Sequence, residues 1–363
     1  EHKVTTPDGY ILGLFRIPHG ISGKTLHPSG DAASASASRP VVFLQHGLLD
    51  SSYTWVNNFP HQSLGFILAD AGYDVWLGNS RGNQYSKEHT KYPVDSKEFW
   101  RFTWDDMAHF DLPTSIDYVL AATQQDSLSY VGHSQGTIIA LSGFSSNHTL
   151  ASKIKVQVLL APVAYLQHCR SPLLVPLAML RADKLFQVIG FRQFLPDKSI
   201  LQLLAPTFCH ELPHLCDDIL FPVVGASNNL NASRIDVYVS ETPADTSVMN
   251  MAHWAQSVRS DEFEMYDWGC GLLSCHNKDH YGQKTPPSYN LTNVVTPTAL
   301  YAGTNDVLAD PKDVDKLRSL LPPALVVDYL VLDGFAHLDF TWAPDAAEKL
   351  YPSVVAVLRK YNP

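Results

Sequence analysis

An α/β fold, in which helices flank a mostly parallel central sheet, is predicted by two features of the sequence. Short apolar runs alternate with helix-like segments from residue 40 onward, which is typical of parallel strands joined by helices. The 363 residues are 45% hydrophobic and only 17% charged, so the chain can bury a large core. Its length suits one α/β core that carries a sizeable insertion.

The predicted strands are continuous apolar runs, as expected for strands that are buried on both faces of a parallel sheet. In chain order they are Pro40–Gln45, Tyr73–Leu77, Ser127–Val131, Val156–Ala161, Thr298–Ala302 and Val326–Leu332. Val4–Ile17 predicts an opening β-hairpin around the Asp8-Gly9 turn. Helical patterns lie between the strands, for example over Asp111–Ala122 and Thr137–Ser145.

An insertion is predicted because more than a hundred residues separate the fourth and fifth of these strands. A simple crossover connection is much shorter. We therefore expect a core formed by residues 1–164 and 293–363, and an inserted helical cap formed by residues 165–292. Pro172–Val188 and Val248–Val258 are helix-prone parts of this cap.

The pentapeptide Gly132-His-Ser-Gln-Gly136 fits the G-x-S-x-G pattern of a nucleophile elbow. It lies between a predicted strand and a predicted helix, as such an elbow requires, and this context predicts the α/β-hydrolase fold. The two glycines allow a sharp turn, so that Ser134 projects above the sheet. The alternative is a loop serine between two glycines, which the strand–helix context disfavours. The neighbouring His133 should point away from the catalytic base.

A serine hydroxyl needs a base, and in this fold the base is a late histidine that follows an acidic residue in the chain. His337 follows the last predicted strand, and Asp306 follows the strand before it. Both positions lie at carboxyl ends of parallel strands, where open α/β sheets build their sites. The acidic residues that compete with Asp306 are Asp310, Asp313 and Asp333. The Asp310-Pro311 pair is more typical of a helix start.

The negatively charged oxygen that forms during acyl transfer needs backbone N–H donors, which make up an oxyanion hole. One donor should be Gln135, directly after the nucleophile. The other should come from the loop after the first core strand, where Gly47 allows close backbone approach and Leu48 supplies the N–H group.

Longer motifs extend over almost the whole chain. They are Asp8-Gly-Tyr-Ile-Leu12, Leu44-Gln-His-Gly-Leu-Leu49, Asp74-Val-Trp-Leu-Gly-Asn-Ser-Arg-Gly-Asn83, Phe102-Thr-Trp-Asp-Asp-Met107, Tyr130-Val-Gly-His-Ser-Gln-Gly136 and His337-Leu-Asp-Phe340. Together they resemble the acid lipase family, which includes lysosomal and gastric lipases. The resemblance implies the same triad, Ser134, Asp306 and His337, and the same oxyanion donors, Leu48 and Gln135. It also implies a movable lid near residues 200–232.

The family resemblance further implies a serine-dependent lipase. Such an enzyme would hydrolyse esters of long-chain fatty acids, either triacylglycerols or steryl esters, through an acyl-enzyme on Ser134 and at acidic pH. Two alternatives remain open: an esterase or acyltransferase with other acyl substrates, and an inactive lipid-binding protein. The apolar stretches Pro172–Leu180 and Ile219–Val224 either meet a lipid–water interface or pack on the sheet. The oligomeric state stays open.

The charge pattern excludes a typical nucleic-acid partner, because the net charge is −10 and no run of Lys or Arg forms a basic face. Protonation of all sixteen histidines would change the formal charge to +6. These histidines are either scattered structural residues or a sign of an acidic compartment. The spacing of Cys and His fits no zinc site, and we expect no metal or organic cofactor. No apolar stretch is long enough for a transmembrane segment.

A secreted or lysosomal location is expected from the cysteines and the glycosylation motifs. Two local disulfides, Cys209 with Cys216 and Cys270 with Cys275, would leave Cys169 as a free thiol, although sequence alone does not fix the pairing. Three N-x-S/T motifs suggest a glycoprotein; they begin at Asn147, Asn231 and Asn290. The chain begins inside a strand-like stretch, so we expect a removed signal segment before it.

Overall fold

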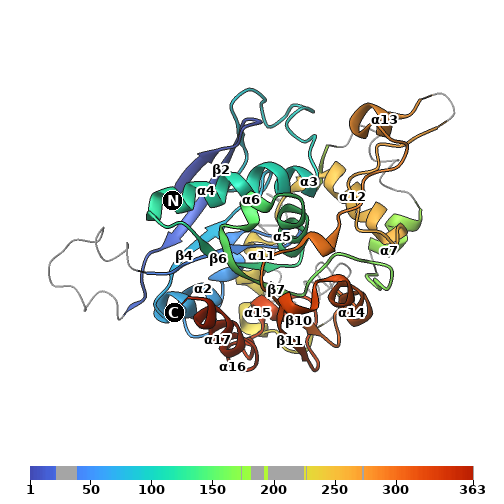
Figure 1. Ribbon diagram of the computed structural model, residues 1–363. Helices are drawn as coiled ribbons and strands as arrows, with labels where there is room; N and C mark the ends of the chain where they lie inside the picture. Colours follow the sequence, from blue (N-terminus) through green and yellow to red (C-terminus); the bar gives the residue numbers. More distant parts are fainter. Residues whose placement is uncertain are drawn as a thin grey trace.

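The structure is a computed structural model, and it describes residues 1–21, 39–172, 174–180, 192–194, 225, 227–271 and 274–362. Within these ranges a central sheet is flanked by helices, which confirms the predicted α/β fold (Figure 1). A compact apolar core fills the space between the sheet and the helices on its faces.

The central sheet has the strand order β1-β2-β4-β3-β6-β7-β10-β11, and the short β5 pairs with β2. The strands are β1 (His2–Thr5), β2 (Tyr10–Ile17), β3 (Val41–Gln45), β4 (Asp74–Gly78), β5 (Glu88–His89), β6 (Leu128–His133), β7 (Ile154–Leu160), β10 (Thr298–Gly303) and β11 (Val326–Leu332). All neighbours from β4 to β11 are parallel, whereas β1 and β2 are antiparallel. The opening hairpin and the six apolar runs are confirmed as strands.

The direction in which the chain adds strands to the sheet reverses at β3. The next strand, β4, lies on one side of β3, whereas β6 lies on the other side and β7, β10 and β11 follow outward. In open α/β sheets, ligands bind at the carboxyl ends of the strands beside such a reversal. The loop after β3 and the residue after β6, Ser134, both lie at this point.

Helices cover both faces of the sheet. On one face lie α4 (Leu112–Thr123) and α5 (Gln135–Ser146), and on the other lie α2 (Leu64–Asp70) and α17 (Tyr351–Tyr361) (Figure 1). The remaining core helices are α3 (Trp104–Asp106), α6 (His148–Ala151), α14 (Pro311–Leu320), α15 (Asp339–Trp342) and α16 (Ala346–Lys349). A π-helical turn, Met107–Asp111, joins α3 to α4, so the helical backbone begins earlier than the predicted Asp111.

Residues 165–292, which we call the inserted segment, leave the core after β7 and rejoin it before β10. The described α-helices and strands of this segment are α7 (Leu174–Met179), β8 (Gln193–Phe194), α11 (Ile235–Glu241), β9 (Thr246–Ser247), α12 (Val248–Arg259) and α13 (His276–Tyr281). Helices α7, α12 and α13 lie on the right of Figure 1. The division into a core and a cap stays a prediction, and the lid predicted near residues 200–232 lies outside the described residues except for 225 and 227–232.

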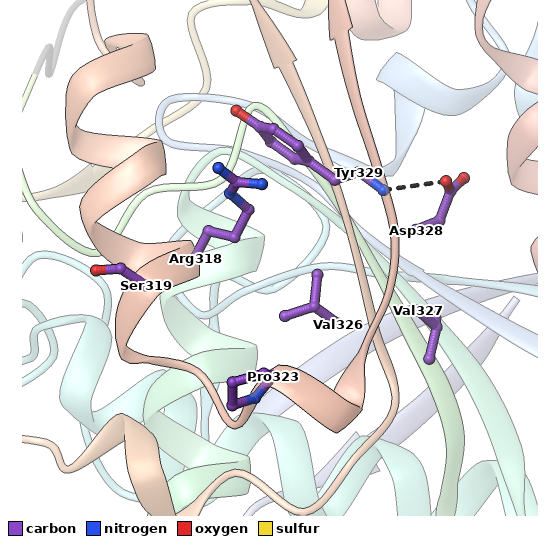
Figure 2. A pocket seen from close by; sticks show the side chains of 7 residues that line it. All are labelled: Arg318, Ser319, Pro323, Val326, Val327, Asp328 and Tyr329. Carbon is purple, nitrogen blue, oxygen red and sulfur yellow. Dashed lines mark hydrogen bonds between the residues drawn. The ribbon is translucent and has the colours of Figure 1, made fainter.

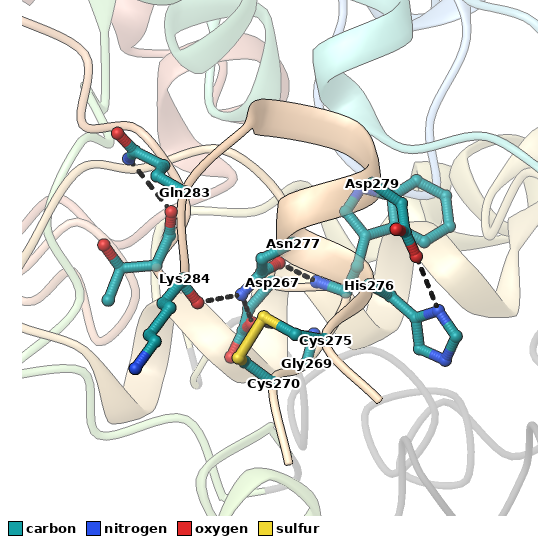
Figure 3. The surroundings of a disulfide bond; sticks show 11 residues. Asp267, Gly269, Cys270, Cys275, His276, Asn277, Asp279, Gln283 and Lys284 are labelled. Atoms are coloured by element: carbon teal, nitrogen blue, oxygen red, sulfur yellow. Dashed lines mark hydrogen bonds and ion pairs between the residues drawn. A yellow bond between two sulfur atoms is a disulfide. The ribbon is translucent and has the colours of Figure 1, made fainter. Parts of the chain in front are cut away.

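The inserted segment contains a disulfide between Cys270 and Cys275, as predicted (Figure 3). Next to it, the amide of Asn277 donates hydrogen bonds to the Asp267 carboxylate at 2.7 Å and to the Lys284 carbonyl oxygen at 2.8 Å. Cys169 is a buried free thiol, and Cys209 and Cys216 lie outside the described residues. Among the described helices, none combines the length and the apolar character that a membrane crossing requires.

Candidate active site

Three side chains that are far apart in sequence meet at the carboxyl edge of the sheet. His337 Nε2 lies 2.7 Å from Ser134 Oγ, and His337 Nδ1 lies 2.8 and 3.0 Å from the two carboxylate oxygens of Asp306. A carboxylate only accepts hydrogen bonds, so Nδ1 carries the imidazole proton. Nε2 then presents a lone pair to the serine hydroxyl, which is the arrangement that base-assisted nucleophilic attack requires.

Ser134 forms the sharp turn between β6 and α5. Its backbone has φ 53° and ψ −117°, a conformation that costs a non-glycine residue about 1–3 kcal/mol. The turn is held by hydrogen bonds from the Ser134 N–H group to the Leu160 carbonyl oxygen at 3.1 Å and from the Thr137 hydroxyl to the Ser134 carbonyl oxygen at 2.6 Å. Gly136 permits this geometry, because a Cβ atom there would collide with the backbone carbonyl oxygen of Gln45.

Of the four acidic residues considered from the sequence, Asp306 is the one that faces the imidazole. Its carboxylate is fully buried and also accepts two backbone N–H groups of its own loop, at 2.8 and 2.9 Å. Asp310 caps the start of α14, as its position before proline suggested. Asp313 accepts hydrogen bonds from His168, and Asp333 is exposed and accepts one from a threonine hydroxyl.

The two predicted oxyanion donors flank the serine. Gln45 of β3 is opposite Gly132 of β6, so the loop after β3 lies beside the turn. A Cβ atom on Gly47 would lie 3.0 Å from the Ser134 Cβ, which is the close approach predicted for this glycine. In the described part of the chain, the N–H groups of Leu48 and Gln135 donate to no protein acceptor, so both are available for an oxyanion.

His46 fixes the loop that carries Leu48, a role that the sequence did not reveal. Its Nε2 accepts hydrogen bonds from the Ser80 N–H group at 3.0 Å and the Asn83 amide at 3.2 Å. Its Nδ1 therefore carries the proton and lies 2.8 Å from the Gly47 carbonyl oxygen. Burial lowers the pKa of His46 to about 4, so the ring keeps this tautomer in mild acid.

The side chain of His133 does not point away from the base, contrary to the prediction. Its Nε2 donates a hydrogen bond of 2.9 Å to the backbone carbonyl oxygen of His337. Burial, followed by the influence of His337, lowers the pKa of His133 to about 3. The prediction failed because the alternation of side chains along a strand ends at Ser134, where φ is positive.

Asp339 holds the histidine loop to the inserted segment, and sequence reasoning missed this contact as well. Its buried carboxylate accepts the Ala336 N–H group at 2.7 Å and the Asn229 amide at 2.8 Å, and it also accepts the Ser227 hydroxyl. Burial raises the pKa of Asp339 above its ordinary value. The loop that carries His337 is thus anchored on both sides of the imidazole.

The triad is closed to solvent in this conformation, because Ser134 is 3% exposed and His337 is 2% exposed. A pocket of about 460 Å³ lies elsewhere, between α14 and the first half of β11, where Arg318 and Tyr329 line it (Figure 2). It opens at the start of β11, whereas the triad follows the carboxyl ends of the strands. In the ranges that the structure describes, no group of three His, Cys, Asp or Glu side chains could hold a metal ion.

The three asparagines of the N-x-S/T motifs lie at the surface, with Asn147 and Asn290 exposed and Asn231 partly exposed. In each, the carboxamide oxygen accepts a nearby backbone N–H group at 3.0 Å. The side chains of Ser233 and Thr292 also donate to their asparagines. Each asparagine thus takes part in a local turn at the surface.

Comparisons with known proteins show which proteins this chain is similar to. Residues 40–344 match the family described as alpha/beta hydrolase fold, and residues 1–59 match a partial alpha/beta-hydrolase lipase region. The gastric triacylglycerol lipase of Bos taurus is 47% identical over 361 residues, which cover 98% of this chain and 87% of the relative. The human lysosomal acid lipase/cholesteryl ester hydrolase is 43% identical over 365 residues, covering 100% of this chain and 88% of the relative.

Solved structures show the same fold at low sequence identity. A soluble variant of the monoglyceride lipase of Saccharomyces cerevisiae, bound to a substrate analogue, superposes with a TM-score of 0.56 at 16% identity. The match covers 99% of this chain and 95% of that structure. A likeness at this identity concerns the arrangement of strands and helices.

Proposed function

This chain belongs to the acid lipase family of α/β hydrolases, and we propose that Ser134, His337 and Asp306 are its catalytic triad. It is a carboxylic ester hydrolase of the lipase type. The observation that carries the assignment of residues is the pair of contacts made by one imidazole, 2.7 Å to the serine oxygen and 2.8 Å to the carboxylate. The first distance is short enough for proton transfer from Ser134 to His337, and the second is short enough for Asp306 to fix the tautomer of the imidazole.

In the proposed reaction, His337 Nε2 takes the hydroxyl proton while Ser134 Oγ attacks the ester carbonyl carbon. The N–H groups of Leu48 and Gln135 stabilise the tetrahedral oxyanion, and the Asp306 carboxylate stabilises the imidazolium. His337 then protonates the leaving alcohol, and an acyl-enzyme remains on Ser134. A water molecule, activated by the same imidazole, releases the fatty acid and restores the serine.

The substrates proposed for this chain are triacylglycerols, steryl esters or both. This choice rests on the two relatives named above, one a triacylglycerol lipase and the other a cholesteryl ester hydrolase. Activity in mild acid is proposed on the same basis. The neutral tautomer of His46, which holds the loop of Leu48, supports it, because the pKa of His46 is lowered to about 4.

Contact with a lipid–water interface is proposed for the end of α7. In that helix Leu174 and Ala178 are buried, whereas Met179 is 61% exposed and Leu180, directly after it, is 79% exposed. Two adjacent apolar side chains in water are costly, and a lipid surface would cover them. The second stretch considered from the sequence, Ile219–Val224, lies outside the described residues.

A secretory or lysosomal location and N-glycans on Asn147, Asn231 and Asn290 are proposed as well. The disulfide between Cys270 and Cys275 favours an oxidising compartment. The surface positions of the three asparagines are compatible with glycosylation. Removal of N-glycans by an amidase, compared between wild type and single Asn→Gln variants, tests each position by its shift in mass.

The central test compares wild type with Ser134→Ala. We expect release of fatty acid from emulsified triolein or cholesteryl oleate by wild type at pH 5, and a loss of at least about 10⁴-fold in the variant. Thermal unfolding checks that the variant is folded. Hydrolysis that persists in a folded Ser134→Ala protein would exclude Ser134 as the nucleophile.

A further inference from the structure

The side chain of Gln135 is bound by the inserted segment. Gln135 Oε1 accepts two hydrogen bonds, one from Asn250 Nδ2 at 2.9 Å and one from Trp254 Nε1 at 2.8 Å. Asn250 and Trp254 are four residues apart on α12, so both project from the same face of that helix. All three side chains are at most 2% exposed, and solvent cannot replace either donor.

This contact fixes which way the Gln135 amide points. Its oxygen must face the two donors, and its nitrogen then faces Met107 Sδ at 3.5 Å, in the π-helical turn. A reversed amide would place its NH₂ group against two donors and leave both without an acceptor. The amide therefore has one favourable orientation, which α12 sets.

The orientation of Gln135 matters because its backbone N–H group is one of the two proposed oxyanion donors. The peptide that carries this N–H group follows Ser134, whose combination of φ 53° and ψ −117° is strained. Rotation of that peptide changes ψ of Ser134, so it would take the residue out of the strained combination and turn the donor away from the oxyanion position. A side chain held at its far end resists such a rotation.

Hydrogen bonds hold Asn250 in place, but burial of its side-chain oxygen costs free energy. Its Nδ2 also donates to Thr246 Oγ1 at 3.0 Å, and its N–H group donates to Ser247 Oγ at 2.8 Å. Its Oδ1 is buried and has no hydrogen-bond partner in the described part of the chain. An apolar residue would avoid this cost, so packing alone gives no reason for an amide here.

We propose that Asn250 and Trp254 of α12 are positioning residues for the oxyanion donor Gln135. The inference rests on the proposed function, and it deepens it by linking the inserted segment to the transition state rather than to substrate binding. Interactions that act only in the transition state change kcat and leave KM unaltered. A contact that only docks the inserted segment would not show this pattern.

The test uses Trp254→Phe, which removes one N–H group and keeps a buried ring, and Asn250→Leu, which removes the amide at similar volume. Activity is measured with p-nitrophenyl butyrate, a soluble ester with a short acyl chain. We expect kcat to fall about 10-fold in each variant and about 10²-fold in the double variant, near the loss of a whole oxyanion donor. KM should stay within about twofold.

The affinity for an alkyl boronic acid provides a second readout. Its adduct with Ser134 Oγ is tetrahedral and anionic, so it occupies the oxyanion hole without any turnover. We expect its Kd to rise by the same factor as kcat/KM falls. A fall in kcat with an unchanged boronate Kd would overturn the proposal, and so would a rise in KM with an unchanged kcat.

Two control variants keep the comparison matched. Gln256→Ala removes a side chain of α12 that bonds the backbone of Asp267, and Gln84→Ala removes a bond from the core to Glu241 of the inserted segment. Neither touches Gln135, and both should keep the wild-type kcat. An equal loss in Gln84→Ala would indicate general docking and overturn the proposal.

The Ser134→Ala variant distinguishes a failure of the proposed function from a failure of the proposed role of Asn250 and Trp254. If hydrolysis by wild type does not depend on Ser134, the proposed function fails. If it does depend on Ser134 while folded Trp254→Phe and Asn250→Leu keep the wild-type kcat, this inference alone fails.

Discussion

The imidazole Nε2 of His133 lies 2.9 Å from the backbone carbonyl oxygen of His337, so the residue before the nucleophile binds the main chain of the proposed base. The two rings are 5.2 Å apart, and both are buried. His133 Nδ1 has no hydrogen-bond partner in the described part of the chain. One directed bond therefore joins the loop after β11 to the end of β6.

Removal of the hydrogen bond from His133 to the His337 carbonyl oxygen should clearly lower kcat and change the thermal midpoint Tm only a little. In His133→Leu the His337 carbonyl loses its donor, and we expect kcat to fall about 10-fold through a less well placed imidazole. Steady-state kinetics and the thermal midpoint Tm provide the measurement. His133→Gln, whose amide can donate in the same direction, should recover part of the loss, and equal losses in both variants would contradict a role for the bond.

Asp306→Asn should cost about 10⁴-fold in kcat. The introduced amide nitrogen would face His337 Nδ1–H, so the imidazole would be driven to the other tautomer and could no longer accept the serine proton. Asp333→Asn, at an exposed position close to the same loop, is the matched control and should keep the wild-type rate. Similar losses in both variants would indicate that Asp306 has no special role.

Asp339→Asn should destabilise the protein and reduce its activity together. The carboxylate accepts three donors, and an amide would present its NH₂ group to at least one of them. A buried donor that loses its acceptor costs about 1–3 kcal/mol, which Tm measurements resolve. Ser227→Ala removes the serine hydroxyl alone, so a kcat near wild type in that variant would locate the effect at the other two donors, the Ala336 N–H group and the Asn229 amide.

Asp50 should make the stability depend on pH. It lies at the end of the loop after β3, and burial raises its pKa to about 7 from 3.8. Between these two values the folded state binds the proton and the unfolded state does not, so stability decreases as pH rises toward 7. The full effect is at most about 4 kcal/mol by the linkage relation.

Asp50→Asn removes this dependence because an amide does not ionise. We expect the Tm of the variant, relative to wild type, to be higher at pH 8 than at pH 5. Asp126→Asn, at an exposed position, controls for the loss of one negative charge. A constant difference in Tm across this pH range would show that Asp50 is not buried as described.

The main strands were predictable from sequence because each is a short, mostly apolar run, a pattern that burial within the sheet favours for the inner strands β3, β4, β6, β7 and β10. Strands β5, β8 and β9 have two residues each and carry no such pattern, since pairing alone defines them. The π-helical turn before α4 was missed for a related reason. Its backbone geometry depends on packing against α5, which no local pattern records.

The residues of the candidate site were predictable from sequence, but the contacts that hold them in place were not. Ser134, Asp306 and His337 could be chosen because chain order and strand ends constrain them. The contacts of His133 and of Asp339 depend on loops that meet only in three dimensions. The bond from Trp254 to Gln135 joins residues 119 positions apart, and no spacing rule connects them.

The direct pairing of β7 with β10, in which Leu160 lies opposite Tyr301, has an evolutionary consequence. The chain leaves for the inserted segment at the carboxyl end of β7 and returns at the amino end of the adjacent parallel strand β10, so the two strands pair in the same way whatever the length between them. The inserted segment can therefore change in length without altering the register of the sheet. An exchanged insert would still have to supply the donors that Asn250 and Trp254 provide to Gln135 and that Asn229 provides to Asp339, because these contacts support the proposed site.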